Sequence, residues 1–280
     1  MLLVSLVEAY AVRRATRPNT TEFYHRCARR LTRHLGRPAA VEDLPHLNEL
    51  LAAKQTRRPA YRKSLRTGLV ALWRFAAESG LAAEPRHVAP VRLPAAPVHT
   101  WSQTEVERLR AHAERTRGPF IRSTMPRGRY WHTLIGAAWY TGLSLIDLRR
   151  IALADIGPGG NLAAVRSKTG RLVLVGLPPE EVAAVVAYHA IAGRGTGPLW
   201  PRWGSEEAFR RAFGHITRAA GLAGPWKTLR ASAGTAFELA HPGQGHLFLG
   251  NSRDVFLRNY YDPRREPATL PHAPRLGRLG

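Results

Sequence analysis

The chain has 280 residues, enough for one large domain or two smaller ones with a real core. Its 42 Lys and Arg residues outweigh 20 Asp and Glu residues, giving a formal net charge of +22. Codon bias in a GC-rich genome would raise the share of Arg, but it would not by itself remove acidic residues. This balance predicts a nucleic-acid partner, and the alternative is a merely solvated basic surface.

Cysteine, histidine and hydropathy exclude several classes of protein. The single Cys27 excludes an internal disulfide and a cysteine metal cluster. The histidines form no spaced ligand motif, so we expect no metal and no cofactor. The apolar start, residues 1–7, is too short to span a membrane and lacks a preceding basic region, so we interpret it as the first turns of a helix. We therefore expect a cytoplasmic protein without membrane contact, associated with the nucleoid when it binds DNA.

Residues 1–81 predict a small helical domain. Residues 19–36 begin with an Asn-Thr-Thr-Glu cap signal and end on Gly36. Residues 59–80 place apolar side chains on one face at helical spacing, namely Leu65, Leu69, Leu72, Trp73 and Ala76. The leading end of this helix is strongly basic, with Arg57, Arg58, Arg62, Lys63 and Arg66. Because no acidic partner stands nearby, we expect this basic cluster to contact DNA phosphates; an ordinary solvated helix face is the alternative.

A linker and a second domain follow. Residues 82–99 hold several prolines without helical periodicity, which predicts a semi-stiff linker. The Ser-Gln-Thr-Glu at 102–105 is a capping box, so the second domain occupies 100–262. We expect a β-hairpin of 162–167 and 171–177, with helices at 131–141, 144–152, 178–188, 205–220, 228–240 and 252–260. The Pro-, Arg- and Gly-rich tail, 263–280, is predicted to be mobile unless it docks on a partner.

Short motifs in the second domain stand in a distinctive order. They are TGLSLIDL at 141–148, SKTGR at 167–171, KTLR at 227–230, and LGN at 249–251 with a tyrosine nine residues later. In order and spacing these motifs resemble the tyrosine recombinase, or phage integrase, family. The resemblance covers residues 101–262, and the helical domain before it resembles the family's core-binding domain with weaker specificity.

The resemblance implies a set of catalytic roles. Cutting DNA without a metal needs a nucleophile, a stabiliser for the crowded phosphate and an acid for the departing 5′-oxygen. By resemblance Tyr260 is the nucleophile, with Tyr261 as a neighbouring alternative. Arg230 matches the second arginine of the phosphate clamp, and Lys168 matches the hairpin lysine. Asp147 matches the acidic residue three positions after the first arginine.

The chain departs from the family pattern at three catalytic positions. Ser144 stands in place of the first arginine, Lys227 in place of a histidine, and Asn251 in place of a histidine or tryptophan. Lys227 keeps a positive charge and Asn251 can still donate a hydrogen bond, whereas Ser144 replaces a bidentate cation and is expected to cap a helix with Asp147. Removing one charge-stabilising donor costs about 10²–10³ in rate, so we expect impaired or lost cleavage. Arginines that could approach the substituted position are Arg149, Arg150 and Arg253.

Together these features predict a mainly α protein with a small β-sheet, in which a helical core-binding-like (SAM-like) domain and a tyrosine-recombinase-like catalytic domain close around duplex DNA. The predicted function is DNA binding in site-specific recombination or mobile-element integration, with a possible homo-oligomer on DNA. An active recombinase with a 3′-phosphotyrosyl DNA intermediate is the first alternative. The second is a non-enzymatic basic protein that binds RNA or an assembly partner.

Overall fold

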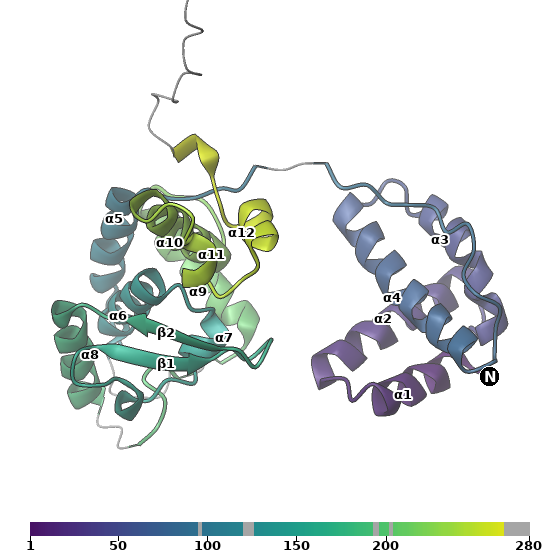
Figure 1. Cartoon of the computed structure of the whole chain (residues 1–280), viewed down its shortest axis with the longest axis horizontal. Helices are drawn as coiled ribbons and strands as arrows, with labels where there is room; N and C mark the ends of the chain where they lie inside the picture. Colours follow the sequence, from purple (N-terminus) through teal and green to yellow (C-terminus); the bar gives the residue numbers. More distant parts are fainter. Residues whose placement is uncertain (95–96, 120–125, 193–195, 202–203, 266–280) are drawn as a thin grey trace, which may run out of the picture. The chain divides into compact units, whose positions relative to one another are not determined.

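The computed structural model describes residues 1–94, 97–119, 126–192, 196–201 and 204–265. The chain divides into two compact units, residues 1–96 and 97–280 (Figure 1). Each unit has its own hydrophobic core. The described elements are mostly helices, with one two-stranded antiparallel sheet. The predicted fold class is therefore confirmed. Among the described residues, no helix is long and apolar enough to cross a membrane.

Unit 1 is a helical bundle. Its elements are α1 (Leu3–Arg13), α2 (Pro18–Leu35), η1 (Val41–His46), α3 (Leu47–Ala53) and α4 (Pro59–Glu78). The apolar face predicted on α4 is buried against α1, α2 and α3. The predicted start of α2 is wrong by one residue, because Pro18 occupies the first turn and no side chain caps the helix. Its predicted end is right, since Gly36 adopts the left-handed conformation, with φ of 71°.

The first part of the Pro-rich segment packs on unit 1. Trp73 Nε1 donates to the Ala83 carbonyl at 2.8 Å. Arg66 Nε donates to the Ala89 carbonyl at 2.8 Å, and the Ala89 N–H donates to the Asn48 side chain at 3.0 Å. Residues 83–89 are therefore held against the helices by specific hydrogen bonds.

The elements of unit 2 pack around its helix α6 (Arg127–Thr141). This helix contacts α5 (Gln103–Glu114), α8 (Pro179–Ala192), α10 (Trp226–Ala240) and the sheet (Figure 1). The other elements are α7 (Leu145–Leu148), η2 (Leu153–Asp155), β1 (Asn161–Val165), β2 (Leu172–Gly176), α9 (Glu206–Ala219), α11 (Gly245–Phe248), α12 (Arg253–Asn259) and η3 (Pro263–Arg265). Trp131 packs against Phe209 and Phe213 of α9 with ring centroids 5.1 and 5.9 Å apart. This aromatic cluster joins the centre of unit 2 to its outer helices.

Local signals in unit 2 are mostly confirmed. Ser102 Oγ accepts the Glu105 N–H while the Glu105 carboxylate accepts the Ser102 N–H at 2.7 Å, which completes the predicted capping box. β1 and β2 form the predicted hairpin. The helix predicted at 144–152 is wrong at its end: α7 stops at Leu148, and beyond it the Ile151 carbonyl accepts a hydrogen bond from the Leu199 N–H.

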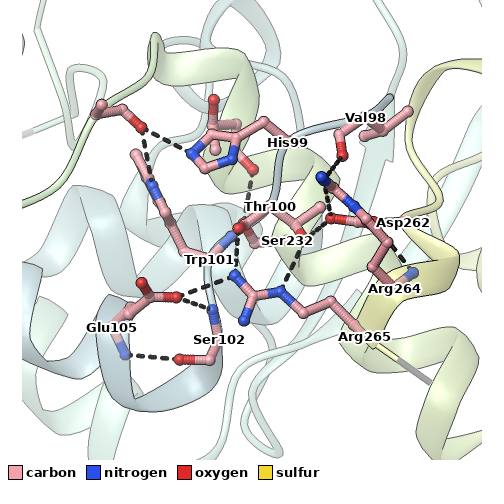
Figure 2. A network of polar contacts seen from close by, with 12 residues as sticks. Val98, His99, Thr100, Trp101, Ser102, Glu105, Ser232, Asp262, Arg264 and Arg265 are labelled. Carbon is pink, nitrogen blue, oxygen red and sulfur yellow. Dashed lines mark hydrogen bonds and ion pairs between the residues drawn. The ribbon is translucent and has the colours of Figure 1, made fainter. Parts of the chain in front are cut away.

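The two ends of the described part of unit 2 are joined by a polar network (Figure 2). Thr100 Oγ1 donates to the Asp262 carboxylate at 2.9 Å, and Arg265 Nη2 donates to the Thr100 carbonyl at 2.6 Å. Arg264 bonds the same Asp262 carboxylate and the Val98 carbonyl. Residues 263–265, at the start of the predicted mobile tail, therefore contact the rest of unit 2 around the buried Asp262. The rest of the predicted tail, 266–280, lies outside the described residues.

Candidate active site

A cavity of about 360 Å³ opens in unit 2 where α7, the hairpin, α10 and α12 meet. All the predicted catalytic residues and the substituted position line this cavity: Ser144, Asp147, Lys168, Lys227, Arg230, Asn251 and Tyr260. They come from segments up to 116 residues apart, between 144 and 260. The fold thus brings the motifs found in the sequence to one place.

Arg230 is buried in the wall of the cavity. Its Nη1 donates to the Gly142 carbonyl, and its Nη2 donates to the Leu249 carbonyl at 2.8 Å. Gly142 ends α6 in the left-handed conformation, and Leu249 ends α11, so each helix end supplies a carbonyl that its own helix leaves available. Burial lowers the pKa of Arg230, and the neighbouring Tyr260 and Asp147 oppose that shift.

Tyr260 lies at the end of α12 with its ring against two cations. Arg230 Cζ is 5.1 Å and Lys227 Nζ is 5.2 Å from the ring centroid. Thr235 Oγ1 donates a hydrogen bond to the Tyr260 carbonyl at 2.9 Å and accepts one from the Asp262 N–H at 3.1 Å. The tyrosine is thus positioned by its own chain. The alternative, Tyr261, packs on Phe256 with ring centroids 5.8 Å apart.

Ser144 occupies the N-cap position of α7, as predicted, but its hydroxyl does not cap the backbone. Instead Ser144 Oγ donates to Asp147 Oδ2 at 2.6 Å, while Asp147 Oδ1 accepts the Ser167 N–H at 2.7 Å. Burial alone would raise the pKa of Asp147, but these hydrogen bonds and the charge of Arg166 outweigh it and lower the pKa. Asp147 is therefore a buried carboxylate that joins α7 to the hairpin.

Sequence reasoning missed Arg166, which is 6% exposed and lines the cavity. Arg166 Nη2 donates to the Leu249 carbonyl, and Nη1 lies 3.5 Å from Asp147 Oδ2. Burial, followed by the charge of Arg230, lowers the pKa of Arg166 to about 10. The available signal was alternation, because Leu162 and Ala164 of β1 and Arg166, just after it, are buried at every second position.

The other polar residues of the cavity can reach a ligand. Lys168 lies exposed in the hairpin turn and Lys227 lies exposed in the first turn of α10. Asn251 Nδ2 is buried, and it has no hydrogen-bond partner among the described residues. These groups are donors available to an anion that enters the cavity.

The three arginines suggested as substitutes for the missing one have different surroundings. Arg149 pairs with Glu206, and its guanidinium lies 4.7 Å from the Phe209 ring centroid. Arg150 Nη1 donates to Ser167 Oγ at 3.1 Å. Arg253 is exposed in the first turn of α12. None of these three arginines is among the described residues that line the cavity.

The basic cluster predicted on unit 1 is partly exposed. Arg57, Arg58 and Lys63 are exposed, whereas Arg62 and Arg66 are half-buried. Arg66 donates to the carbonyls of Val88 and Ala89, so part of its donor capacity is already used within the unit. The exposed members remain the predicted phosphate contacts.

Comparison with solved structures found several that resemble this chain. A lambda integrase dimer bound to a COC′ core site has a TM-score of 0.71 and 18% identity, covering 96% of this chain and 80% of that chain. The Tn1549 transposon integrase in complex with circular intermediate DNA has a TM-score of 0.68 and 13% identity, covering 93% and 95%. The XerH site-specific recombinase bound to palindromic difH substrate has a TM-score of 0.62 and 15% identity, covering 78% and 67%.

Protein-family models and curated protein sequences gave no match to this chain. The structural likeness, at these low identities, shows the fold: this chain has the fold of the tyrosine recombinases and integrases. The expectation drawn from the sequence resemblance is thereby confirmed at the level of the fold.

Proposed function

We propose that this chain binds duplex DNA at a specific site and acts there in recombination or integration as a tyrosine-recombinase-like protein. The observation that carries the proposal is the meeting of Tyr260, Arg230 and Lys168, from three separate elements, at one basic cavity. The net charge of +22 supports a nucleic-acid partner. The similar lambda integrase, Tn1549 integrase and XerH structures are DNA complexes.

The cavity is suited to transfer a phosphoryl group from DNA to tyrosine. The Tyr260 oxygen attacks the phosphorus and its proton is lost to solvent, so a 3′-phosphotyrosyl bond forms while the bond to the 5′-oxygen breaks. The buried Arg230 guanidinium stabilises the charge that grows on the nonbridging oxygens. Lys168, exposed at the rim, gives a proton to the departing 5′-oxygen. Rejoining is the reverse of this step and needs no external energy.

We expect this cleavage to be slow. Ser144, Lys227 and Asn251 replace groups that the family uses, and one lost transition-state donor costs about 10²–10³ in rate. The losses do not add independently, since such groups act as a unit. Sequence-specific DNA binding is then the main property, with strand cleavage as a weak second one.

Assembly and location follow from the same proposal. The lambda integrase structures include a dimer on a core site and a tetramer on a Holliday junction. We propose that this chain likewise forms a homo-oligomer on DNA, in the cytoplasm. The exposed part of the basic cluster on unit 1, Arg57, Arg58 and Lys63, would contribute phosphate contacts.

The test begins by selecting duplexes that the full chain binds from a randomised pool. A selected duplex is then nicked beside the candidate cleavage position, so that the short product diffuses away and the covalent adduct accumulates. We expect a slow adduct that Tyr260→Phe abolishes and the matched control Tyr261→Phe retains, while both keep DNA affinity. Failure to enrich any duplex would refute DNA binding; adduct formation by Tyr260→Phe would refute the assigned nucleophile.

A further inference from the structure

Two buried guanidinium groups meet in the cavity, although the sequence places only one there. Arg166 Nη2 and Arg230 Nη2 both donate to the Leu249 carbonyl, so the two cations are close neighbours. Both side chains are less than one-tenth exposed, and each has its pKa lowered by burial. Burying like charges side by side is costly unless opposite charge compensates them.

The compensation within the protein is incomplete. Among the described residues that line the cavity, Asp147 is the one carboxylate, against Arg166, Lys168, Lys227 and Arg230. Arg166 Nε is buried and, in the described part of the chain, has no hydrogen-bond partner. The same holds for Asn251 Nδ2. An anion in the cavity would balance the charge and accept from these donors.

Arg166 also meets the carboxylate that belongs with the missing arginine. Asp147 Oδ2 accepts from Ser144 Oγ at 2.6 Å and lies 3.5 Å from Arg166 Nη1. Position 144, at the start of α7, and Arg166, just after β1, therefore converge on one oxygen. The Arg166 guanidinium thus approaches from the hairpin the same carboxylate oxygen that the side chain at position 144 contacts from the start of α7.

We infer that Arg166 replaces the arginine missing at position 144 and forms, with Arg230, a two-guanidinium clamp for a phosphate group, with Asp147 orienting it. The inference rests on the proposed function for the source of that phosphate, a DNA phosphodiester. During attack by Tyr260 the clamp donates hydrogen bonds to the nonbridging oxygens and exchanges no proton or electron. The guanidinium that is missing at position 144 is thereby replaced by that of Arg166, which lies outside the family motifs.

A purely structural Arg166 would merely tie the hairpin to the Leu249 carbonyl. The first experiment separates the two roles with inorganic phosphate, which needs no knowledge of the DNA site. Phosphate binding to the full chain is followed by ³¹P NMR line broadening for the wild type, Arg166→Gln and the control Arg171→Gln. Arg171 is exposed, pairs with Arg166 across the hairpin backbone and loses the same charge.

We expect Arg166→Gln to weaken phosphate binding about tenfold or more, because one charged donor pair is lost, and Arg171→Gln to leave it unchanged. Adding Ser144→Arg to Arg166→Gln should recover affinity, since the new guanidinium reaches the same carboxylate. Circular dichroism and thermal unfolding verify that each variant is folded. Equal phosphate affinity in the wild type and Arg166→Gln, including no measurable binding by either, would overturn the inference; so would a double variant that is folded and not rescued.

The second experiment tests the clamp in the reaction, on the selected duplex with sulfur replacing the bridging 5′-oxygen. A thiolate leaves without a proton donor, so this substrate should restore adduct formation by Lys168→Met. It should not restore adduct formation by Arg166→Gln, which is expected to remain about 10²–10³-fold slower than that of the wild type. Rescue of Arg166→Gln by sulfur contradicts the clamp. If the wild type forms no adduct, the proposed cleavage fails, and the phosphate titration alone decides whether the clamp exists.

Discussion

Thr235 connects Tyr260, the proposed nucleophile, to the helix that carries Arg230, so its hydroxyl can be tested as an anchor. It is 2% exposed, donates to the Tyr260 carbonyl at 2.9 Å and accepts from the Asp262 N–H at 3.1 Å. Thr235→Val keeps the shape and removes both hydrogen bonds. A buried polar group left without a partner costs about 1–3 kcal/mol. Because two backbone groups lose their partner, we expect the free energy of unfolding of unit 2 to fall by about 2–4 kcal/mol.

Urea denaturation followed by tryptophan fluorescence measures this loss. Of the chain's 7 tryptophans, Trp73 alone belongs to unit 1, so the signal reports mainly on unit 2. With a urea dependence of about 2–3 kcal/mol/M, the midpoint should shift by about 1 M or somewhat more. Adduct formation on the nicked duplex should also fall in native buffer, because the end of α12 is no longer pinned beside Arg230.

The matched control is Thr217→Val on α9. Thr217 is equally buried, at 2% exposed, and its hydroxyl donates to the Gly214 carbonyl of its own helix. Loss of this hydroxyl should lower the free energy of unfolding by no more than about 1 kcal/mol and should leave adduct formation unchanged. An equal loss of stability in the two variants, or unchanged adduct formation by Thr235→Val, would refute the role assigned to this hydroxyl as an anchor.

Three other outcomes are expected. Gly250→Ala should lower stability by about 1–2 kcal/mol and weaken phosphate binding, because Gly250 has φ of 61° and the new methyl would lie 2.8 Å from Val173 Cγ1; wild-type affinity would contradict this. The hydrogen bond from Arg264 lowers the pKa of Asp262 and outweighs burial, which raises it. The ionised Asp262 therefore stabilises the fold fully above the usual pKa of 3.8, and this stabilisation is lost as pH falls through the pKa of the folded protein. In urea titrations between pH 5 and 2, Asp262→Asn should therefore flatten the acid-induced loss, and an unchanged pH dependence would count against this ion pair. Replacing the exposed basic residues of unit 1 by Ala should reduce the log–log salt slope of DNA binding by up to about three units, and an unaltered slope would show that they do not contact phosphate. These residues are Arg57, Arg58 and Lys63.

Local patterns were sufficient to predict most elements. The Ser102 capping box, the helix end at Gly36 and the hairpin strands depend on residues within a few positions of each other, and all three are found. Errors occur where distant contacts decide. Beyond the early end of α7, the Ile151 carbonyl bonds Leu199, far along the chain, and residues 263–265 contact Asp262 and Thr100.

The residues of the candidate site also fall into those that local motifs predict and those that only distant contacts reveal. Tyr260, Arg230 and Lys168 could be placed because their motifs are short and ordered, and the structure brings them to one cavity. Arg166 was missed because an arginine next to a turn is ordinarily solvated. Only the fold reveals that it turns inward, toward Asp147 and the Leu249 carbonyl.

The network that holds the chain beyond α12 has a consequence for exchange between neighbouring molecules. Swapping α12 and the following residues would first break the Thr235 bonds to Tyr260 and Asp262, and then the contacts of Arg264 and Arg265 around Thr100 (Figure 2). These contacts form within one chain, so their strength does not depend on protein concentration, whereas the swapped contacts do. Dilution therefore favours molecules in which Tyr260 stays packed in its own chain. Under the proposed function, an exchange of Tyr260 between molecules would require the high local concentration that binding to one DNA molecule creates.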